Sequence, residues 1–219
     1  MDRCPRCGAT LRTLLLCESC QALQEPVRPP TPFEALGLEP GFALDPKALQ
    51  KRLRELSRGL HPDYFGTADE ATRARAQHST AELNGAFQVL ADEAQRADYL
   101  VGWLGGPRED QERSMPLEFL QEVLEWNEAI EEARTSGPDS AQRKALEPLE
   151  RRLASERSTL MHRVAETLTP LPPRGAPALS ETRKLLNAIR YLDRALGEIA
   201  ELRLVQSTSR QATNQSTNR

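Results

Sequence analysis

The chain has 219 residues, of which 38% are hydrophobic, 28% charged and 5% aromatic, and its formal net charge at pH 7 is −3. This length allows one or two domains with a hydrophobic core, and the composition is typical of a soluble helical protein. A charge this small implies neither bulk affinity for nucleic acid nor attraction to a membrane, and the longest apolar run, Leu14 to Leu16, is far shorter than the roughly 20 residues of a spanning helix.

All four cysteines lie in the first twenty residues, in two CxxC pairs. Two such pairs can offer four thiolates to one ion and hold together a segment too short to bury a core. We therefore predict a structural zinc site with four ligands, Cys4, Cys7, Cys17 and Cys20. Iron is an alternative, because tetrahedral sulfur ligation suits both metals. Disulfides are less favoured, because no signal peptide is visible and a cytoplasmic location is expected. A redox pair is less favoured as well, because no βαβ pattern surrounds the motif.

A proline-rich linker at 24–32 favours extended backbone, and a short helical segment follows at 33–38. A longer helix then begins with Asp45 as its N-cap and Pro46 in its first position, and it runs to about Leu60. Its two faces lie about 200° apart. The apolar face carries Leu49, Leu53, Leu56 and Leu60, and the cationic face carries Lys47, Lys51, Arg54 and Arg58.

The tripeptide His61-Pro62-Asp63 stands where the cationic face ends. Pro62 ends the helix, because the residue before a proline disfavours helical backbone. After a loop through Gly66, helix resumes near Thr67, with a buried face at Ala76, Leu83, Phe87 and Leu90. We predict an antiparallel hairpin of these two helices, with the segment 33–36 packed across it. The cationic face and the loop suit an acidic partner, although a row of cations alone is more often a solvated helix face.

A further helical signal at 94–104 ends at the break 105–107, and the charged stretch 107–114 is predicted to be a loop. A helix over 116–133 carries a core stripe of Phe119, Val123, Trp126, Ile130 and Ala133. An adjoining face carries Leu117, Leu120 and Leu124, beside Glu125, Glu128 and Glu132. This patch indicates either a partner site or a wider buried face of a bundle helix, and periodicity alone favours the buried face.

Two more helices complete the chain. The first carries Leu146, Leu149, Leu153, Leu160, Val164 and Leu168, with Pro148 in its first turn or kinking it. After a proline-rich loop at 169–177, the second begins near Ser180 and carries Leu185, Ile189, Leu192, Leu196 and Ile199, while Tyr191 lies off this stripe. The tail from Gln206 has no apolar period and is predicted to be disordered.

From Pro32 to Leu204, the pattern resembles the HscB family of J-type co-chaperones, which serve iron–sulfur cluster biogenesis. The residues that carry the resemblance include the segments His61-Pro62-Asp63-Tyr64-Phe65, Leu83-Asn84-Gly85-Ala86-Phe87, Phe119-Leu120-Gln121-Glu122 and Arg190-Tyr191-Leu192-Asp193. Members with two N-terminal CxxC pairs also resemble this chain in the exit Cys20-Gln21-Ala22-Leu23-Gln24.

The resemblance implies an all-α fold, with a J-domain helical hairpin, a C-terminal three-helix bundle and a small N-terminal four-cysteine metal module. We place the metal module at 1–27, the J-domain with its linker at 28–105, the scaffold-binding domain at 106–205 and the disordered tail at 206–219.

The resemblance also implies that the chain is a co-chaperone and not an enzyme. A 70-kDa heat-shock class ATPase chaperone, HscA- or DnaK-like, would be bound by His61, Pro62, Asp63, Lys51, Arg54 and Arg58. An iron–sulfur cluster scaffold protein, IscU-like, would be bound by Leu120, Leu124, Glu125, Glu128, Glu132 and Tyr191. The resemblance thus favours a partner site over a buried face for the leucine patch. Asp63 would be a trigger for hydrolysis and not its general base, since the nucleotide belongs to the chaperone.

Three alternatives differ in partner or in class. A J-domain co-chaperone could serve another client. A zinc ribbon that binds nucleic acid gains a little support from Arg3, Arg6 and Arg12, but no aromatic residues are interleaved with them. An enzyme is disfavoured, because the three histidines, His61, His78 and His162, have no accompanying nucleophile or carboxylate at a recognisable spacing. We expect neither nucleic acid nor a membrane as a partner.

Overall fold

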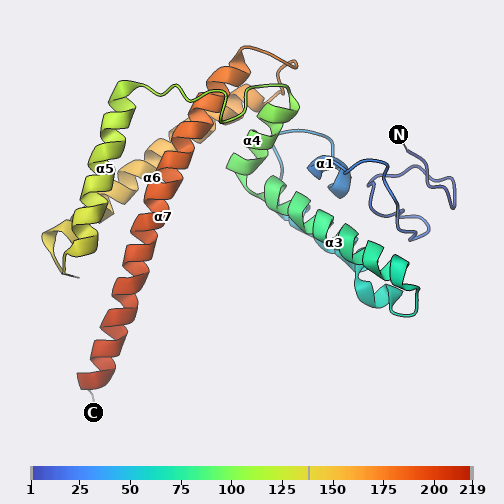
Figure 1. Cartoon of the computed structure of the whole chain (residues 1–219), viewed down its shortest axis with the longest axis horizontal. Helices are drawn as coiled ribbons and strands as arrows, with labels where there is room; N and C mark the ends of the chain where they lie inside the picture. Colours follow the sequence, from blue (N-terminus) through green and yellow to red (C-terminus); the bar gives the residue numbers. More distant parts are fainter. Residues whose placement is uncertain (1, 138, 218–219) are drawn as a thin grey trace. The chain divides into compact units, whose positions relative to one another are not determined.

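The computed structural model describes residues 2–137 and 139–217, apart from the side chains of Pro62 and of residues 205–217. Within these residues the named elements are all helical (Figure 1), which confirms the predicted all-α class. They are α1 (Pro32–Leu36), α2 (Pro46–Leu60), the 3-10 helix η1 (Pro62–Phe65), α3 (Glu70–Ala91), α4 (Glu93–Trp103), α5 (Leu117–Thr135), α6 (Ala141–Leu168) and α7 (Ala178–Thr217). No helix in this part of the chain combines the length and the apolarity needed to cross a bilayer.

The chain divides into two compact units. One unit comprises Met1–Leu100 with Leu168–Leu171, and the other comprises Val101–Thr167 with Pro172–Arg219. The four-cysteine segment, which the sequence presents as a module of its own, lies within the first unit together with the helical hairpin.

In the first unit, α2 and α3 form the predicted hairpin, and α1 packs against α3 (Figure 1). The apolar face of α2 is turned inward, because Leu49, Leu56 and Leu60 are buried and Leu53 is half-buried. The four cations of the opposite face, Lys47, Lys51, Arg54 and Arg58, are all exposed. The predicted division of this helix into two faces is therefore confirmed.

Side-chain caps set where α2 and α3 begin. Asp45 accepts a first-turn backbone N–H at 2.9 Å, as predicted. The second helix begins at Glu70 and not near Thr67. Asp69 is its N-cap and accepts the N–H of Thr72 at 2.7 Å, so the turn before Asp69 stays outside the helix.

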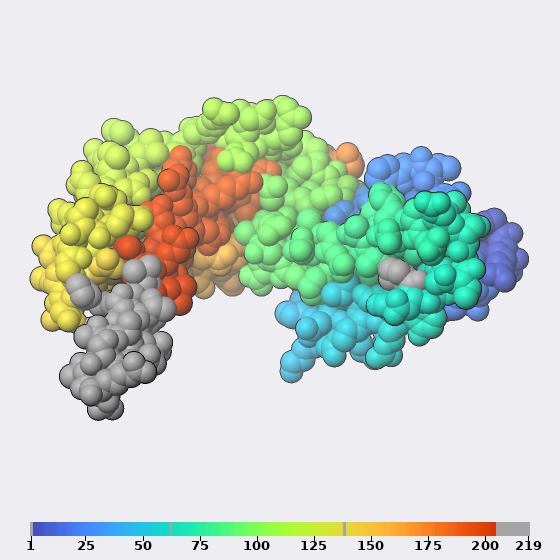
Figure 2. Space-filling model, turned by 60° about the horizontal axis from the view of Figure 1, so that its bottom comes forward, coloured from blue at the N-terminus to red at the C-terminus, as the bar shows by residue number. Residues whose placement is uncertain are grey.

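In the second unit, α5, α6 and α7 form the predicted three-helix bundle. Figure 2 shows α5, in yellow-green, alongside α7, in orange-red. The core of the bundle is formed by Trp126, Ile130, Ala133, Leu146, Leu153, Leu192, Ala195, Ile199 and Leu202. Each helix thus contributes part of the apolar stripe that its sequence predicts.

The helix α6 begins at Ala141, one turn earlier than the leucine pattern from Leu146 indicates. The hydroxyl of Ser140 accepts the N–H of Arg143 at 3.2 Å and so starts the helix before its first buried leucine. Pro148 consequently lies inside the helix and not in its first turn.

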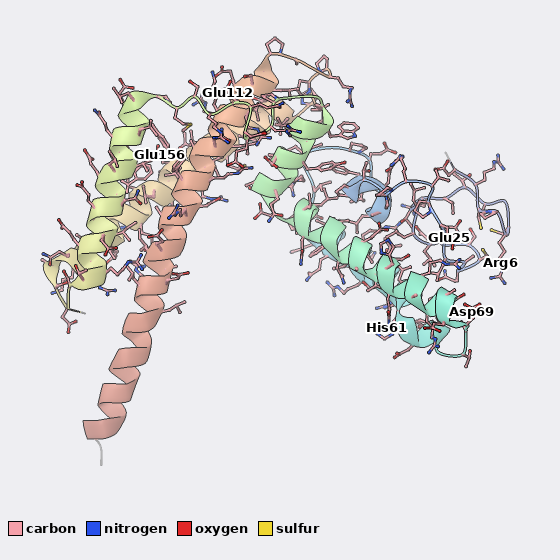
Figure 3. All side chains as sticks on the ribbon, viewed as in Figure 1. Arg6, Glu25, His61, Asp69, Glu112 and Glu156 are labelled. Atoms are coloured by element: carbon pink, nitrogen blue, oxygen red, sulfur yellow. The ribbon has the colours of Figure 1, made fainter. Side chains whose placement is uncertain are left out.

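The start of α7 is covered by the loop before α5, which changes its buried face. The Arg183 guanidinium donates to the carbonyl of Pro107 at 2.9 Å, and the Asn187 amide donates to the carbonyl of Glu112 at 2.6 Å (Glu112 is labelled in Figure 3). Burial on this side explains why Leu186 is buried, whereas Leu185, which the sequence places in the stripe, is only half-buried.

At its other end, α7 continues to Thr217, where the sequence predicts a disordered tail from Gln206. The segment 198–217 contains neither glycine nor proline, so the hydrogen bonds of the preceding turns continue although the apolar period has ended. Positions 218–219 of the predicted tail lie outside the described residues.

Candidate functional site

The four-cysteine segment is built from two turns of the same form. In each turn the N–H of the first cysteine donates to the carbonyl five residues later, at 2.8 Å for Cys4 and 2.9 Å for Cys17. The N–H four residues later donates back to that cysteine's carbonyl, at 2.8 Å from both Gly8 and Gln21. Both of these closing residues have positive φ, 74° and 57°. The repeated turn brings two pairs of thiols face to face.

The spacing of the sulfur atoms suits a single tetrahedral ion. All four Sγ atoms lie within 4.8 Å of one another, with 3.7 Å between Cys4 and Cys20 and 3.6 Å between Cys7 and Cys17. Zinc–sulfur bonds of about 2.3 Å in a tetrahedral site place the sulfurs about 3.8 Å apart, whereas a disulfide requires about 2.05 Å. The four cysteines are free thiols, and Figure 3 shows the sulfurs gathered near Arg6.

The neighbouring thiols shift the pKa values of Cys4 and Cys20 in opposite directions. Burial disfavours the thiolate of Cys4, but backbone N–H groups of the same turn and the neighbouring thiols outweigh burial and lower its pKa to about 6. At Cys20 the N–H of Ala22 lowers the pKa, but burial and the surrounding thiols outweigh that and raise it to about 12. The Cys4 thiolate therefore forms more readily than the Cys20 thiolate.

The tripeptide forms the turn between α2 and η1. The Nδ1 atom of His61 accepts the N–H of Asp63 at 3.3 Å, and the N–H of Tyr64 donates to the His61 carbonyl at 3.0 Å. The predicted loop is thus a 3-10 turn, because Pro62 has the φ of a first helical position. The side chain of Asp63 is 90% exposed and that of His61 57% exposed. Figure 3 shows His61 at the end of the hairpin. The side chain of Pro62 lies outside the described residues.

The exposed cations of α2 lead towards this turn. The Arg54 guanidinium donates to the backbone and side-chain oxygens of Gln50 at 3.4 and 3.2 Å, and the Lys51 Nζ lies 3.8 Å from a Glu55 carboxylate oxygen. A surface hollow beside the tripeptide is lined by Ser57, Arg58, His61, Asp63 and Tyr64. Tyr64 is 72% exposed and was not among the predicted site residues. Its place directly after the tripeptide is the sequence signal that could have found it.

The leucines beside the core stripe of α5 are exposed. Leu117, Leu120 and Leu124 are 66%, 38% and 63% exposed, and the three carboxylates beside them, Glu125, Glu128 and Glu132, are exposed as well. This face is therefore not a wider buried face of the bundle, which was the alternative that periodicity favoured. It is an apolar patch with an acidic border.

The remaining predicted residue of this surface, Tyr191, comes from α7 and is 42% exposed. Its ring meets that of Phe119 on α5, and Phe119 meets the buried ring of Trp126, with centroids 5.7 Å apart at 86°. The bundle core thus sets the position of an exposed aromatic residue.

The other histidines lie on helix surfaces. His78 on α3 lies 3.4 Å from Glu82, and His162 on α6 lies 3.4 Å from Glu166, each with an exposed imidazole. Each histidine pairs with a carboxylate one turn later on its own helix, as surface residues commonly do.

Comparison with known proteins identifies the family. Residues 115–200 match the family model described as the HSCB C-terminal oligomerisation domain. A Shewanella baltica protein named co-chaperone protein HscB homolog is 30% identical over 138 residues, which are 63% of this chain and 78% of the relative. The chain belongs to the HscB family of co-chaperones.

Other HscB homologues match over shorter stretches. Those from Shewanella halifaxensis and Vibrio vulnificus are 36% and 41% identical, over 49% and 46% of this chain. The alignments cover 63% and 59% of those relatives, so the chain spans about three fifths of their length.

Two solved HscB structures share the fold. The crystal structure of human co-chaperone protein HscB has a TM-score of 0.70 at 22% identity and covers 91% of this chain and 97% of its own. The structure of HscB from Vibrio cholerae has a TM-score of 0.65 at 23% identity and covers 80% of this chain and 98% of its own. At such low identity, the likeness concerns the fold alone.

One residue that the HscB resemblance did not single out joins two parts of the candidate site. Arg52 is only 9% exposed, and its guanidinium donates to Glu18, within the second CxxC turn, at 2.5 Å. The hydrogen bond from Arg52 holds the pKa of Glu18 below its usual range. The available signal was its position between Leu49 and Leu56, on the apolar face of α2, where a lone cation requires a partner.

Proposed function

We propose that this HscB-family chain is a J-type co-chaperone that links a 70-kDa heat-shock class ATPase chaperone, HscA- or DnaK-like, to an iron–sulfur cluster scaffold protein, IscU-like. The observation that carries this proposal is the presence of two exposed surfaces of different chemistry on the two compact units. One is the cationic face of α2 that ends at the tripeptide, and the other is the apolar, acid-bordered patch of α5.

The chaperone surface would shift the chaperone's equilibrium between two states and would take no chemical part in ATP hydrolysis. The Asp63 carboxylate stands in solvent on a short 3-10 turn, and the cations Lys51, Arg54 and Arg58 lie on the helix that leads to it. Such a surface attracts an acidic partner and orients it by its charge pattern. If it binds one chaperone state more tightly than the other, it shifts the chaperone towards the state that hydrolyses ATP. His61 and Pro62 would complete this surface.

The scaffold surface has the composition of a binding site. Leu120, Leu124 and Tyr191 supply apolar and aromatic contacts at its centre, and Glu125, Glu128 and Glu132 supply charge at its border. Apolar anchors at the centre of an interface contribute most of the affinity, while charges at the rim contribute mainly orientation and association rate.

We also propose zinc as the resident ion of the four-cysteine site. The thiols of Cys4, Cys7, Cys17 and Cys20 fit a tetrahedral ion in number and spacing. A site closed by four thiolates cross-links the segment and keeps no position open for substrate, so its role would be structural.

The test is the ATP turnover of the cognate chaperone, measured with this protein and with the scaffold, separately and together. Each should stimulate turnover weakly alone, and together they should act synergistically. Asp63→Asn should abolish stimulation with the fold intact, because it removes an exposed charge, and Glu166→Gln on α6 should behave as the wild type. Normal stimulation by Asp63→Asn would refute the chaperone surface. Stimulation without scaffold synergy would indicate a J-domain co-chaperone with another client.

A further inference from the structure

The four-cysteine segment is joined to the α2–α3 hairpin by an ion pair whose cation, Arg52, is buried. Arg52 lies on the apolar face of α2, and the anion of the pair is Glu18, which lies between Cys17 and Cys20. The same guanidinium donates through Nε to the carbonyl of Leu36 at 2.8 Å. Because the Arg52 side chain is only 10% exposed, its charge is stabilised by these partners and little by water.

Close packing joins the same parts a second time, at the last turn of α2. A Cβ atom on Gly59 would lie 2.4 Å from a methyl of Leu16 and 2.9 Å from the side-chain oxygen of Gln21. Leu16 is 2% exposed. The second CxxC turn therefore lies directly against the helix two residues before His61.

The chain between the two CxxC pairs and the chain after the second pair are held as well. The Thr13 hydroxyl donates to the carbonyl of Ala35 in α1 at 2.6 Å. After the second pair, the Glu25 carboxylate lies 2.8 Å from the guanidinium of Arg75 in α3. The proline-rich stretch is thus anchored and does not act as a free tether between the metal segment and the hairpin.

From these contacts we infer that metal occupancy of the four-cysteine site is energetically coupled to the order of α2, with Arg52 as the positioning residue that transmits the coupling through Glu18. This inference rests on the proposed metal site. A segment this short needs its ion to hold one conformation, and only that conformation presents Glu18 and Leu16 to α2. Coupling between two sites is reciprocal, so a change at Arg52 must weaken metal binding by the part of the metal's stabilisation of α2 that depends on Arg52.

The metal segment packs against the helix that carries the proposed chaperone surface. Arg52 lies beside Lys51 on α2, and Gly59 adjoins Arg58, so the metal segment supports the inner side of the helix whose outer side carries the exposed cations. A metal module independent of the hairpin would lack the Arg52–Glu18 ion pair and the close approach of Leu16 to Gly59. Metal loss would therefore make α2 less ordered and leave the bundle of α5, α6 and α7 unchanged.

The experiment measures the zinc affinity of the full chain by competition with a chromogenic chelator. Arg52→Gln and Glu18→Gln should each weaken zinc binding by about fivefold or more, and the double variant should be little weaker than either single one. Arg73→Gln, which removes an exposed cation from α3, is the matched control and should leave the affinity unchanged. Hydrogen exchange should show α2 losing protection on zinc removal while α6 keeps it.

The possible results distinguish failure of the proposed coupling between metal and α2 from failure of the proposed zinc site. If Arg52→Gln binds zinc as tightly as the wild type, or if exchange in α2 does not depend on zinc, the coupling is overturned and the zinc site stands. If the wild-type chain binds no zinc, both are overturned. If Arg52→Gln does not fold, Glu18→Gln carries the test, because it removes the same ion pair from a side chain that is 34% exposed.

Discussion

The ring of Tyr191 on α7 stands edge-on to the ring of Phe119 on α5, with centroids 5.9 Å apart and planes at 76°. Phe119 continues this contact to Trp126, which is 1% exposed. An exposed residue of the proposed scaffold surface is therefore fixed in place by the bundle core, and little side-chain entropy is lost when a partner covers it.

Replacing Leu120 and Leu124 together by alanine should weaken scaffold binding by on the order of tenfold or more, since apolar anchors at an interface contribute about 1 to 2 kcal/mol each. Calorimetric titration measures this, while stimulation of the chaperone by the protein alone should persist. Leu204→Ala removes a similar side chain, 67% exposed on α7, and should leave the affinity as it is. Equal scaffold affinity of the double variant and the wild type would exclude this patch.

The same type of substitution should affect stability very differently at a buried position. Leu153 in α6 is fully buried, so Leu153→Ala should lower the free energy of unfolding by about 2 to 5 kcal/mol through lost burial and the cavity it leaves. Leu124→Ala, at a side chain that is 63% exposed, should change it by less than about 0.5 kcal/mol. Urea denaturation followed by circular dichroism compares the two, and similar losses would mean that the α5 leucines are not exposed in solution.

What could be predicted from sequence was local. The stripe of Leu49, Leu56 and Leu60 and the opposite cations depend only on helical period, and the cap at Asp45 depends on its own turn, so these were found. Exposure of Leu124 could not be decided in this way, because a partner-binding face and a wide core face have the same period. It depends on which side of α5 the other helices cover.

The elements that were missed depend on contacts distant in sequence. Arg52 and Glu18 are separated by thirty-four positions, and each alone is a charged residue that is ordinarily solvated. The buried face at the start of α7 likewise depends on the loop that covers Arg183 and Asn187. Periodicity within one segment carries no information about such partners.

The carboxylate of Glu34 should make stability depend on acid pH. Its hydrogen bond from Arg28 outweighs burial and, with the N–H of Thr31, lowers its pKa from the ordinary 4.5 to about 2. A lowered folded-state pKa stabilises the protein above pH 4.5, and this contribution is lost as pH falls from 4.5 towards 2. Because the side chain is partly exposed, solvent screening reduces the effect to about 1 kcal/mol.

Glu34→Gln should accordingly lower the melting temperature at pH 7, and the difference from the wild type should shrink between pH 4.5 and pH 3. Thermal unfolding by circular dichroism at several pH values measures it. Glu166→Gln, an exposed carboxylate of α6, serves for comparison and should show no such convergence. A difference that is constant with pH would show that the charge of Glu34 contributes nothing.

The purified chain should bind one zinc ion through its four thiols, and cobalt in its place should give the absorption of a tetrahedral thiolate site. Cys7→Ser should weaken binding and change that spectrum, whereas Ser19→Ala, in the second turn between Cys17 and Cys20, should preserve both. Acidification should release the metal, because protons compete for the thiolates. A cobalt spectrum of oxygen-rich, octahedral type would contradict the four-sulfur site.

Two glycines inside helices should respond to alanine with opposite sign. At Gly85 in α3 a Cβ meets nothing within 4 Å, so Gly85→Ala should stabilise the protein by about 0.5 to 1 kcal/mol through helix propensity and a less flexible unfolded chain. At Gly59 the added methyl would meet Leu16, which is too well buried to move aside freely. Gly59→Ala should therefore lower stability by about 1 kcal/mol despite the same gain in propensity. Chemical denaturation of the zinc-loaded protein compares them, and equal stabilisation by both would show that the CxxC turn does not pack against α2.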